Sequence, residues 1–244
     1  MNNYFGNSNN TNVHSSNQAA GAMSKTFLSN VFAFMGGGLL LTAVIAWVFG
    51  TNLELFYEYI INSETGRPTP LYWIAAFSPL VLMLVMGFAF EKLPMAALLG
   101  IFIAITVLMG VSLSTLLMGY GVAMVAKAFF ISAGTFAVMA VVGYTTNADL
   151  SKFKTIISIT FMIALVVMLI NVFLMKSSGL ALVLDLIFLA VFVGMIAYKM
   201  QDIRRIGETV GGSQPKLALM AALSLYITFI NLFITILRLM GRRN

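Results

Sequence analysis

The 244-residue sequence contains no cysteine, and its one histidine is His14, in a polar stretch near the N-terminus. The missing cysteines exclude disulfides, thiolate metal sites and cysteine nucleophiles. Because the apolar part of the chain holds no histidine, it also has no histidine ligand for a metal and no histidine proton relay. We therefore predict neither a metal site nor a cofactor.

Charged residues are scarce as well, at 9% of the chain, whereas soluble proteins carry about 25%. Hydrophobic residues make up 60% of the sequence, so the first partner we expect is the lipid bilayer. The net charge is +6, but the 14 Lys and Arg are scattered along the chain rather than gathered in a tract. This scattering argues against a nucleic-acid partner.

Motifs that mark catalysis are missing too. The sequence has no HExxH, no Walker loop and no GxSxG. Its apolar blocks also lack the paired catalytic aspartates or Ser–His pair of an intramembrane protease. We therefore predict that the protein is not an enzyme.

Apolar blocks long enough to cross a bilayer are what the sequence does contain. A hydrocarbon core of about 30 Å needs roughly 20 residues in a helix, and lipid offers no other partner for backbone groups. We predict an all-α integral membrane protein, a seven-transmembrane-helix bundle within residues 26–241. The predicted spans are 27–49, 71–90, 93–118, 122–145, 155–175, 178–198 and 217–239.

The flanks of this domain are polar. Residues 1–25 are rich in Asn and Ser, and they contain too few apolar side chains to offset their conformational entropy. We predict a disordered head there and a short basic tail at 242–244.

Glycines recur inside the predicted spans, and we expect them to allow close packing between helices. They are the run 36–38 and Gly110, Gly134 and Gly143.

The basic residues predict an orientation. With the N-terminus inside, eight Lys and Arg lie inside and six outside, and three of those six belong to the C-terminal stretch, which cannot direct the earlier helices. We predict a cytoplasmic N-terminus and an external C-terminus. An aromatic belt then lies on the outer side, formed by Trp47, Tyr57, Tyr59, Tyr72 and Trp73.

Three stretches carry a family resemblance: "FISAGTFAVMAVVGYTTNADLSKF" (130–153), "KSSGLALVLDLIFLAVFVGMIAYKMQDIRRIGE" (176–208) and "ALSLYITFINLFITILRLMG" (222–241). They resemble the fourth and the last two helices of the Bax inhibitor-1 family, in a YccA-like bacterial form. The resemblance implies a bundle in which six helices surround a central C-terminal helix. It also implies a bacterial inner (plasma) membrane protein that acts as an ion leak and stress modulator.

The family has an aspartate pair on its last two helices, which the resemblance links to a proton-sensitive calcium leak. Two neighbouring carboxylates share a proton, so their pKa values belong to the pair. Here the family's "YDTQ" reads "AYKMQ" and its "LYLDFIN" reads "LYITFIN", so the dyad-equivalent positions hold Lys199 and Thr228. We therefore predict a weak calcium leak. In the alternative interpretation, Lys199 extends its ammonium to the inner interface and never meets the ion pathway.

Asp185 is the only acidic residue well inside a predicted span, and intramembrane carboxylates are usually paired or functional. Helical rise places it about 21 Å from Lys199 along the axis but nearly level with Arg238. We predict an Asp185–Arg238 ion pair between the last two helices. The alternatives are a neutral, protonated Asp185 and one that faces a wet outer vestibule.

Further polar residues complete the candidate sites. We expect Asn171 and Asn231 to form intramembrane hydrogen bonds between helices. Glu91 and Asp202 are candidate partners of Lys199 near the inner end of the bundle. The predicted inner polar cluster comprises Glu91, Lys92, Gln201, Asp202 and Arg204.

The sequence leaves two other functions open. The protein would then be a regulatory partner of a membrane-bound protease or other membrane complex, or a small-anion transporter whose preference is set by Lys199. A membrane protein partner is thus possible, and the sequence predicts no oligomeric state.

Overall fold

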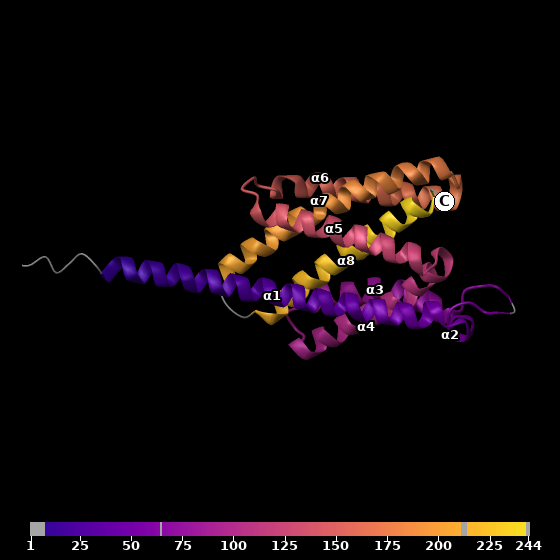
Figure 1. Cartoon of the computed structure of the whole chain (residues 1–244), viewed down its shortest axis with the longest axis horizontal. Coiled ribbons are helices and arrows are strands. Elements are labelled where there is room, and N and C mark those ends of the chain that lie inside the picture. Colours follow the sequence, from indigo (N-terminus) through magenta and orange to yellow (C-terminus); the bar gives the residue numbers. More distant parts are fainter. Residues whose placement is uncertain (1–7, 64, 211–213, 243–244) are drawn as a thin grey trace, which may run out of the picture.

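The computed structural model describes residues 8–63, 65–210 and 214–242. Within these ranges the chain is helical apart from its loops and one isolated antiparallel bridge, Ile61–Pro68. Figure 1 shows the arrangement. The elements are α1 (Ser8–Thr51), α2 (Leu53–Tyr59), α3 (Pro70–Phe88), α4 (Met95–Tyr120), α5 (Val122–Thr145), α6 (Ser151–Ile170), the π-helical η1 (Asn171–Met175), α7 (Ser178–Val210) and α8 (Pro215–Gly241).

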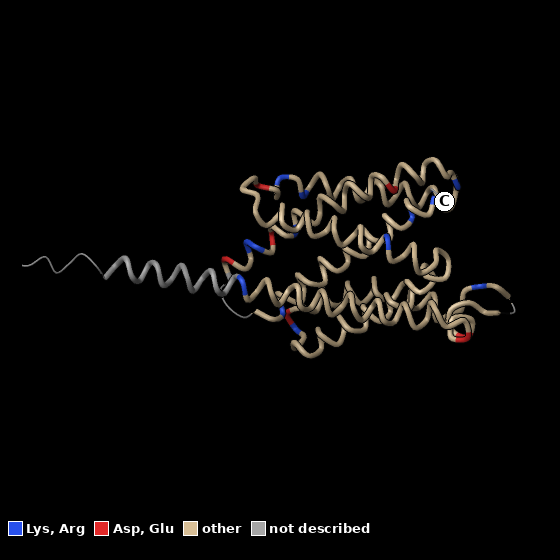
Figure 2. Tube along the Cα trace, in the orientation of Figure 1, with Lys and Arg blue, Asp and Glu red and all other residues tan. Residues whose placement is uncertain are grey.

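The seven predicted spans are confirmed, because seven described helices are long and apolar enough to cross a membrane. The break between the third and fourth spans falls at Gly121, whose φ of +77° suits glycine. Most charged residues lie toward the two ends of the bundle (Figure 2). These ends are called here the N-side, where α3 ends and α4 begins, and the C-side, where α4 ends and α5 begins.

Two boundaries differ from prediction. Residues 8–25 belong to α1 rather than to a disordered head, because extending a helix that the membrane span already nucleates costs little per residue. The head residues 1–7 lie outside the described ranges. α7 runs to Val210 instead of ending at 198, since its polar last turns are supported by an i,i+4 ion pair, Arg204–Glu208.

The C-terminal helix α8 is central, as predicted. Of its most apolar 18-residue window 61% is buried, against 11% for the span that contains α6. α8 packs against α1, α4, α5 and α7, while α3 packs mainly on α4 and α6 on α7. The bundle therefore has one central helix, four helices around it and two further out.

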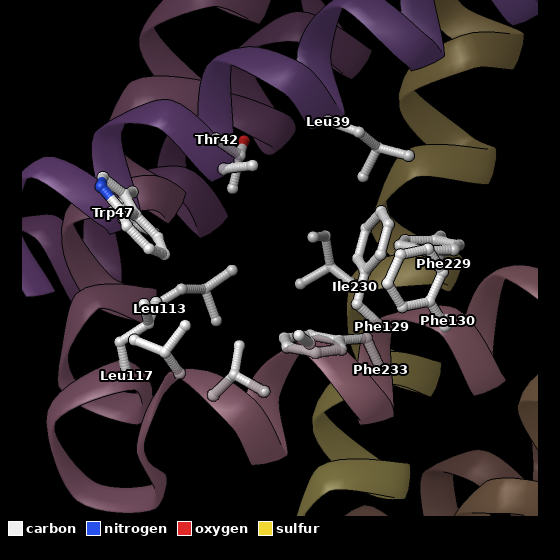
Figure 3. Close-up of a pocket in the computed structure, with 15 residues that line it drawn as sticks. Leu39, Thr42, Trp47, Leu113, Leu117, Phe129, Phe130, Phe229, Ile230 and Phe233 are labelled. Carbon is white, nitrogen blue, oxygen red and sulfur yellow. The ribbon is translucent and has the colours of Figure 1, made fainter.

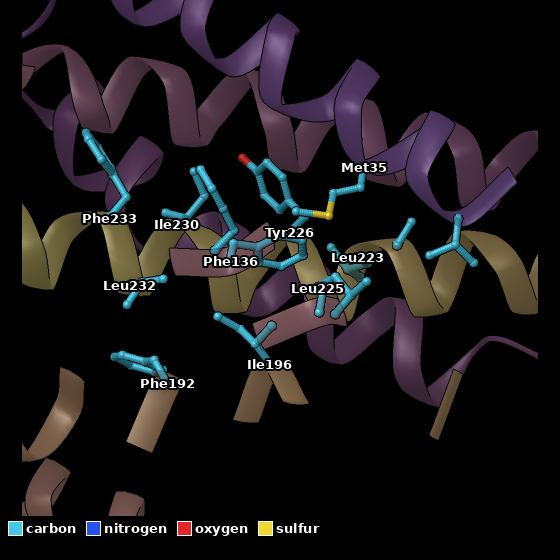
Figure 4. Close-up of a cluster of buried hydrophobic side chains, with 14 of the residues drawn as sticks. Met35, Phe136, Phe192, Ile196, Leu223, Leu225, Tyr226, Ile230, Leu232 and Phe233 are labelled. Carbon is cyan, nitrogen blue, oxygen red and sulfur yellow. The ribbon is translucent and has the colours of Figure 1, made fainter. Parts of the chain in front are cut away.

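The core forms where α8 meets its neighbours. Figure 4 shows α8 side chains such as Tyr226 and Leu232 among Met35 of α1, Phe136 of α5 and Ile196 of α7. Tyr226, Leu232 and Ile196 are fully buried.

Some of the predicted glycines do bring helices together. A Cβ on Gly110 would lie 2.7 Å from Cβ of Ile45, and a Cβ on Gly143 would collide with the backbone of Ala197. A Cβ on Gly38 would lie 2.7 Å from the Phe102 ring. The prediction was wrong for Gly36, Gly37 and Gly134, where a Cβ would meet nothing within 4 Å.

Candidate site at the interface of α7 and α8

Lys199 of α7 reaches the central helix. Its Nζ donates hydrogen bonds to Oγ1 of Thr228, at 2.7 Å, and to the carbonyl oxygen of Ser224, at 3.0 Å. The Thr228 hydroxyl donates in turn to the same Ser224 carbonyl, at 2.8 Å, one turn back along α8. Lys199 and Thr228, the positions that the resemblance matches to the family's aspartate pair, are thus in direct contact, and the lysine side chain is directed toward α8.

This arrangement is possible because a carbonyl oxygen has two lone pairs. The Ser224 oxygen accepts from both Lys199 and Thr228, and the Thr228 oxygen accepts from Lys199 while donating to Ser224. Thr228 is only 2% exposed, so the contact lies inside the bundle. An ammonium donates only, and the described partners of Lys199 in this site are neutral oxygens.

No carboxylate partners Lys199 in the part of the chain that the structure describes. Glu91 and Asp202 are exposed, and neither lies within 4.0 Å of the Lys199 nitrogen. The predicted pairing was wrong because these acids project outward where solvent stabilises their charge. Among the described residues there is also no group of three or more His, Asp or Glu that could hold a metal ion.

The inner polar cluster forms in part. Gln201 is buried and holds the loop between α5 and α6: its Nε2 donates to the Ala148 carbonyl at 2.7 Å, and its Oε1 accepts from the Leu150 N–H at 2.9 Å. Arg204 donates to the Tyr144 carbonyl at 2.6 Å. The polar end of α7 is therefore fastened to α5 and its loop.

An ion pair that the sequence did not predict adds to this fastening. Arg205 Nη2 lies 2.8 Å from Asp149 Oδ1. The Arg205 guanidinium and then the Ser151 hydroxyl lower the pKa of the Asp149 carboxyl to about 2.

Glu91 and Lys92 belong to the turn between α3 and α4. The one described hydrogen bond between this turn and α8 is donated by the Lys216 ammonium to the Leu93 carbonyl, at 2.7 Å. No described ion pair joins Glu91 or Lys92 to Arg204, so that part of the predicted cluster does not form.

The structure brings Asp185 and Arg238 together at the C-side. Arg238 Nη2 lies 2.9 Å from Asp185 Oδ1, and Arg242 Nη2 lies 3.1 Å from Oδ2. The Asp185 side chain is only 5% exposed. Its Oδ2 and the Arg238 Nε have no hydrogen bond of good geometry to the described residues, so these contacts are held by charge more than by aligned hydrogen bonds.

The Arg242 contact was not predicted, because the predicted last span ends at 239 and residue 242 belongs to the predicted tail. The helix continues to Gly241, and Arg242 follows Arg238 by four residues on the same face.

The two asparagines bond locally rather than across helices. Asn171 closes the turn between η1 and α7, donating to the Ser177 carbonyl at 3.1 Å and accepting from its N–H at 2.9 Å. Asn231 donates to the Ile227 carbonyl of its own helix at 2.8 Å. The prediction of bonds between spans was wrong because backbone carbonyls close in the sequence lay within reach, and a carbonyl oxygen can accept a second hydrogen bond.

A buried hydrogen-bond chain on the other face of α8 was not foreseen. The Thr42 hydroxyl of α1 donates to the Thr106 carbonyl of α4 at 2.9 Å, and the Tyr226 hydroxyl, 2.7 Å away, donates to Thr42. These residues lie 64 and 184 positions apart, so no local pattern signals the contact. α8 thus makes polar contacts with α7 on one face and α1 on another.

These features define a multi-pass helical membrane protein built around its last helix, with a lysine bound at the interface of α7 and α8. The chain belongs to the Bax inhibitor-1 family: the family model described as "Inhibitor of apoptosis-promoting Bax1" matches residues 24–244.

Bacterial relatives match over nearly their whole length. The inner membrane protein YbhL of Escherichia coli K12 is 33% identical over 223 residues, covering 90% of this chain and 92% of YbhL. An uncharacterized membrane protein of Streptococcus pyogenes serotype M1 is 32% identical, covering 89% of this chain and 93% of its own. An uncharacterized protein of Caulobacter vibrioides is 31% identical, covering 89% and 88%.

Proposed function

We propose that this protein is a member of the ion-leak and stress-modulating type in which a fixed lysine replaces the proton-sensing acid pair, so that it passes little Ca²⁺. The observation that carries the proposal is the 2.7 Å hydrogen bond between Lys199 Nζ and Thr228 Oγ1. This bond places the Lys199 ammonium, a hydrogen-bond donor, at the two positions where the family resemblance implies titratable aspartates.

Electrostatics favours this reading. Ca²⁺ takes 6–8 oxygen ligands in its sites, many of them carboxylates. An ammonium about 4 Å from the ion repels it by about 8 kcal/mol at an effective dielectric constant near 20, twice the figure for two unit charges. Lys199 sits beside the central helix, so an ion that passed between α7 and α8 would meet that charge.

The test is Ca²⁺ flux into proteoliposomes across a range of pH. We expect the wild-type protein to give little flux at any pH, and the variant Lys199→Asp/Thr228→Asp to give more flux with a marked pH dependence. The matched control is Lys199→Met/Thr228→Val, which removes the cation without adding acid and should stay low.

Two outcomes would overturn the proposal. Wild-type flux equal to that of the double-aspartate variant would show that the ammonium is no barrier. No flux from either, together with a co-purifying membrane protein, would favour the regulatory alternative instead.

We further propose that the protein resides in the bacterial inner membrane with its N-terminus in the cytoplasm and its C-terminus outside. The name of the Escherichia coli relative supports the location. The excess of Lys and Arg at the N-side supports the orientation. The small-anion alternative has less support, because Lys199 already donates to two protein oxygens.

A further inference from the structure

An apolar crevice of about 220 Å³ lies in the C-side half of the bundle, between α1 and α5 and against α8. Figure 3 shows its labelled side chains around an open centre: Trp47 on one side, Leu113 and Leu117 below, and Phe129, Phe229 and Phe233 opposite. α8 packs against both α1 and α5, whereas α1 and α5 have few contacts with each other, which leaves the space between them.

The crevice opens toward lipid. Trp47 and Phe130 line it and are 53% and 73% exposed, so the lining continues into the bilayer-facing surface. Its floor is fixed, because the Phe129 ring packs edge-on against Phe229, with 5.6 Å between ring centroids.

Nothing in the crevice suits water or an ion. Apart from the Trp47 indole N–H, the lining has one polar side chain, Thr42, whose hydroxyl is already bonded to Tyr226 and Thr106. Apolar cavities stay dry, and one of about 150 Å³ suffices to bind benzene. The apolar molecules next to this opening are the acyl chains of the bilayer.

A cation stands beside the crevice. Lys127 directly follows the lining residue Ala126 on α5, is exposed, and makes no hydrogen bond or ion pair with the described residues. A lysine with an apolar stem can reach along the helix to a lipid phosphate at the membrane surface.

We propose that the crevice holds one acyl chain of a membrane phospholipid, inserted sideways between α1 and α5, with the lipid's anionic headgroup beside Lys127. The acyl chain then fills the space between α1 and α5, where the two helices do not pack directly against each other. The bound lipid fills the C-side half of the bundle against α8.

The sequence has two tryptophans, so quenching by brominated lipid can test this directly. In Trp73→Phe, only Trp47 of the crevice remains; in Trp47→Phe, only Trp73 on the exposed face of α3 remains, as a reporter of bulk lipid. In phosphatidylcholine vesicles with a small fraction of dibrominated phosphatidylglycerol, we expect Trp47 to be quenched more than Trp73. Equal quenching would overturn the proposal.

Filling the crevice should remove the excess quenching. In the Trp73→Phe background we expect Ala126→Leu, and Ala43→Leu from the opposite wall, to lower Trp47 quenching to the Trp73 level. The matched control is Ala137→Leu, at an exposed alanine of α5 outside the lining, which should change nothing. A specific site would be contradicted if Ala137→Leu also lowered the quenching of Trp47, or if neither Ala126→Leu nor Ala43→Leu lowered it.

A separate comparison tests whether the anionic headgroup lies beside Lys127. We expect the Trp73→Phe protein to be quenched more by brominated phosphatidylglycerol than by brominated phosphatidylcholine, and Lys127→Gln to abolish that preference. Arg67→Gln removes an equal charge from the loop after α2 and should leave it intact. A preference that survives Lys127→Gln would assign the anionic headgroup elsewhere.

Discussion

At the scale of single residues, the bundle contains two charged side chains that lipid alone could not solvate. Lys199 is held by neutral oxygens of α8, and Asp185 by two arginines of its C-terminal end. Both residues belong to α7, and both find their partners on α8. The interface of these two helices therefore depends on polar contacts at each end.

Removing the acid should be costly. Asp185→Asn leaves Arg238 and Arg242 without a counter-charge, and breaking a buried pair from one side costs about 3 kcal/mol at the low end, which suits guanidiniums that are partly exposed. We expect a clear fall in Tm in detergent micelles.

The control is Asp202→Asn, which neutralises an exposed acid of the same helix that has no ion pair within 4.0 Å in the described chain. Equal falls in Tm for the two variants would mean that the Asp185 contacts contribute nothing specific.

At the scale of helices, close approach is set by a few glycines and not by glycine content. On α5, Gly143 meets the backbone of Ala197 on α7, whereas Gly134 faces open space. The contact lies two residues before Lys199, so it holds α5 against the part of α7 that bears the lysine.

The same substitution should therefore have opposite effects on one helix. Gly143→Ala forces α5 and α7 apart, and overpacking of this kind costs about 1–3 kcal/mol. Gly134→Ala adds a better helix former without a clash and should be neutral or stabilising by up to about 1 kcal/mol. Thermal unfolding of both variants in the same detergent measures the difference, and a Gly143→Ala protein as stable as Gly134→Ala would contradict the close contact.

Hydropathy predicted the helices because the bilayer imposes a length and denies any other backbone geometry. It could not predict where polar side chains bond. Asn231 and Asn171 donate hydrogen bonds to carbonyls close in the sequence, while Tyr226 bonds to Thr42, which lies far away in the sequence. The Asp185–Arg238 contact was predictable because helical rise fixes depth along two adjacent helices. The crevice was not, since it arises from the spacing of α1 and α5 around α8.

At the scale of the whole molecule, the two ends of the bundle differ in charge and in aromatic content. The N-side has the polar end of α7 and its Asp149–Arg205 pair. The C-side has α2 and the exposed Trp47, Tyr57 and Trp73. Trp and Tyr side chains are enriched at membrane interfaces, which fits an interfacial position for the C-side.

The orientation can be read with single cysteines, because the natural sequence has none. Ser63→Cys in the loop between α2 and α3 and Asn147→Cys in the loop between α5 and α6 place exposed thiols on opposite sides. In intact bacteria we expect a membrane-impermeant maleimide to label position 63 and not 147. In permeabilised cells we expect both positions to be labelled. Labelling of position 147 and not of 63 in intact cells would mean that the proposed topology is inverted.

α8 follows the other membrane helices in the sequence, and this order separates their insertion from their assembly. Six membrane helices precede α8, and four of them pack against it. Until α8 is made, Lys199 lacks Thr228, Asp185 lacks its arginines and Thr42 lacks Tyr226. A nascent chain stopped before residue 215 would hold these groups in lipid with no partner, which makes it a substrate for quality control. The contacts of α8 can form only once residues 215–241 have left the ribosome.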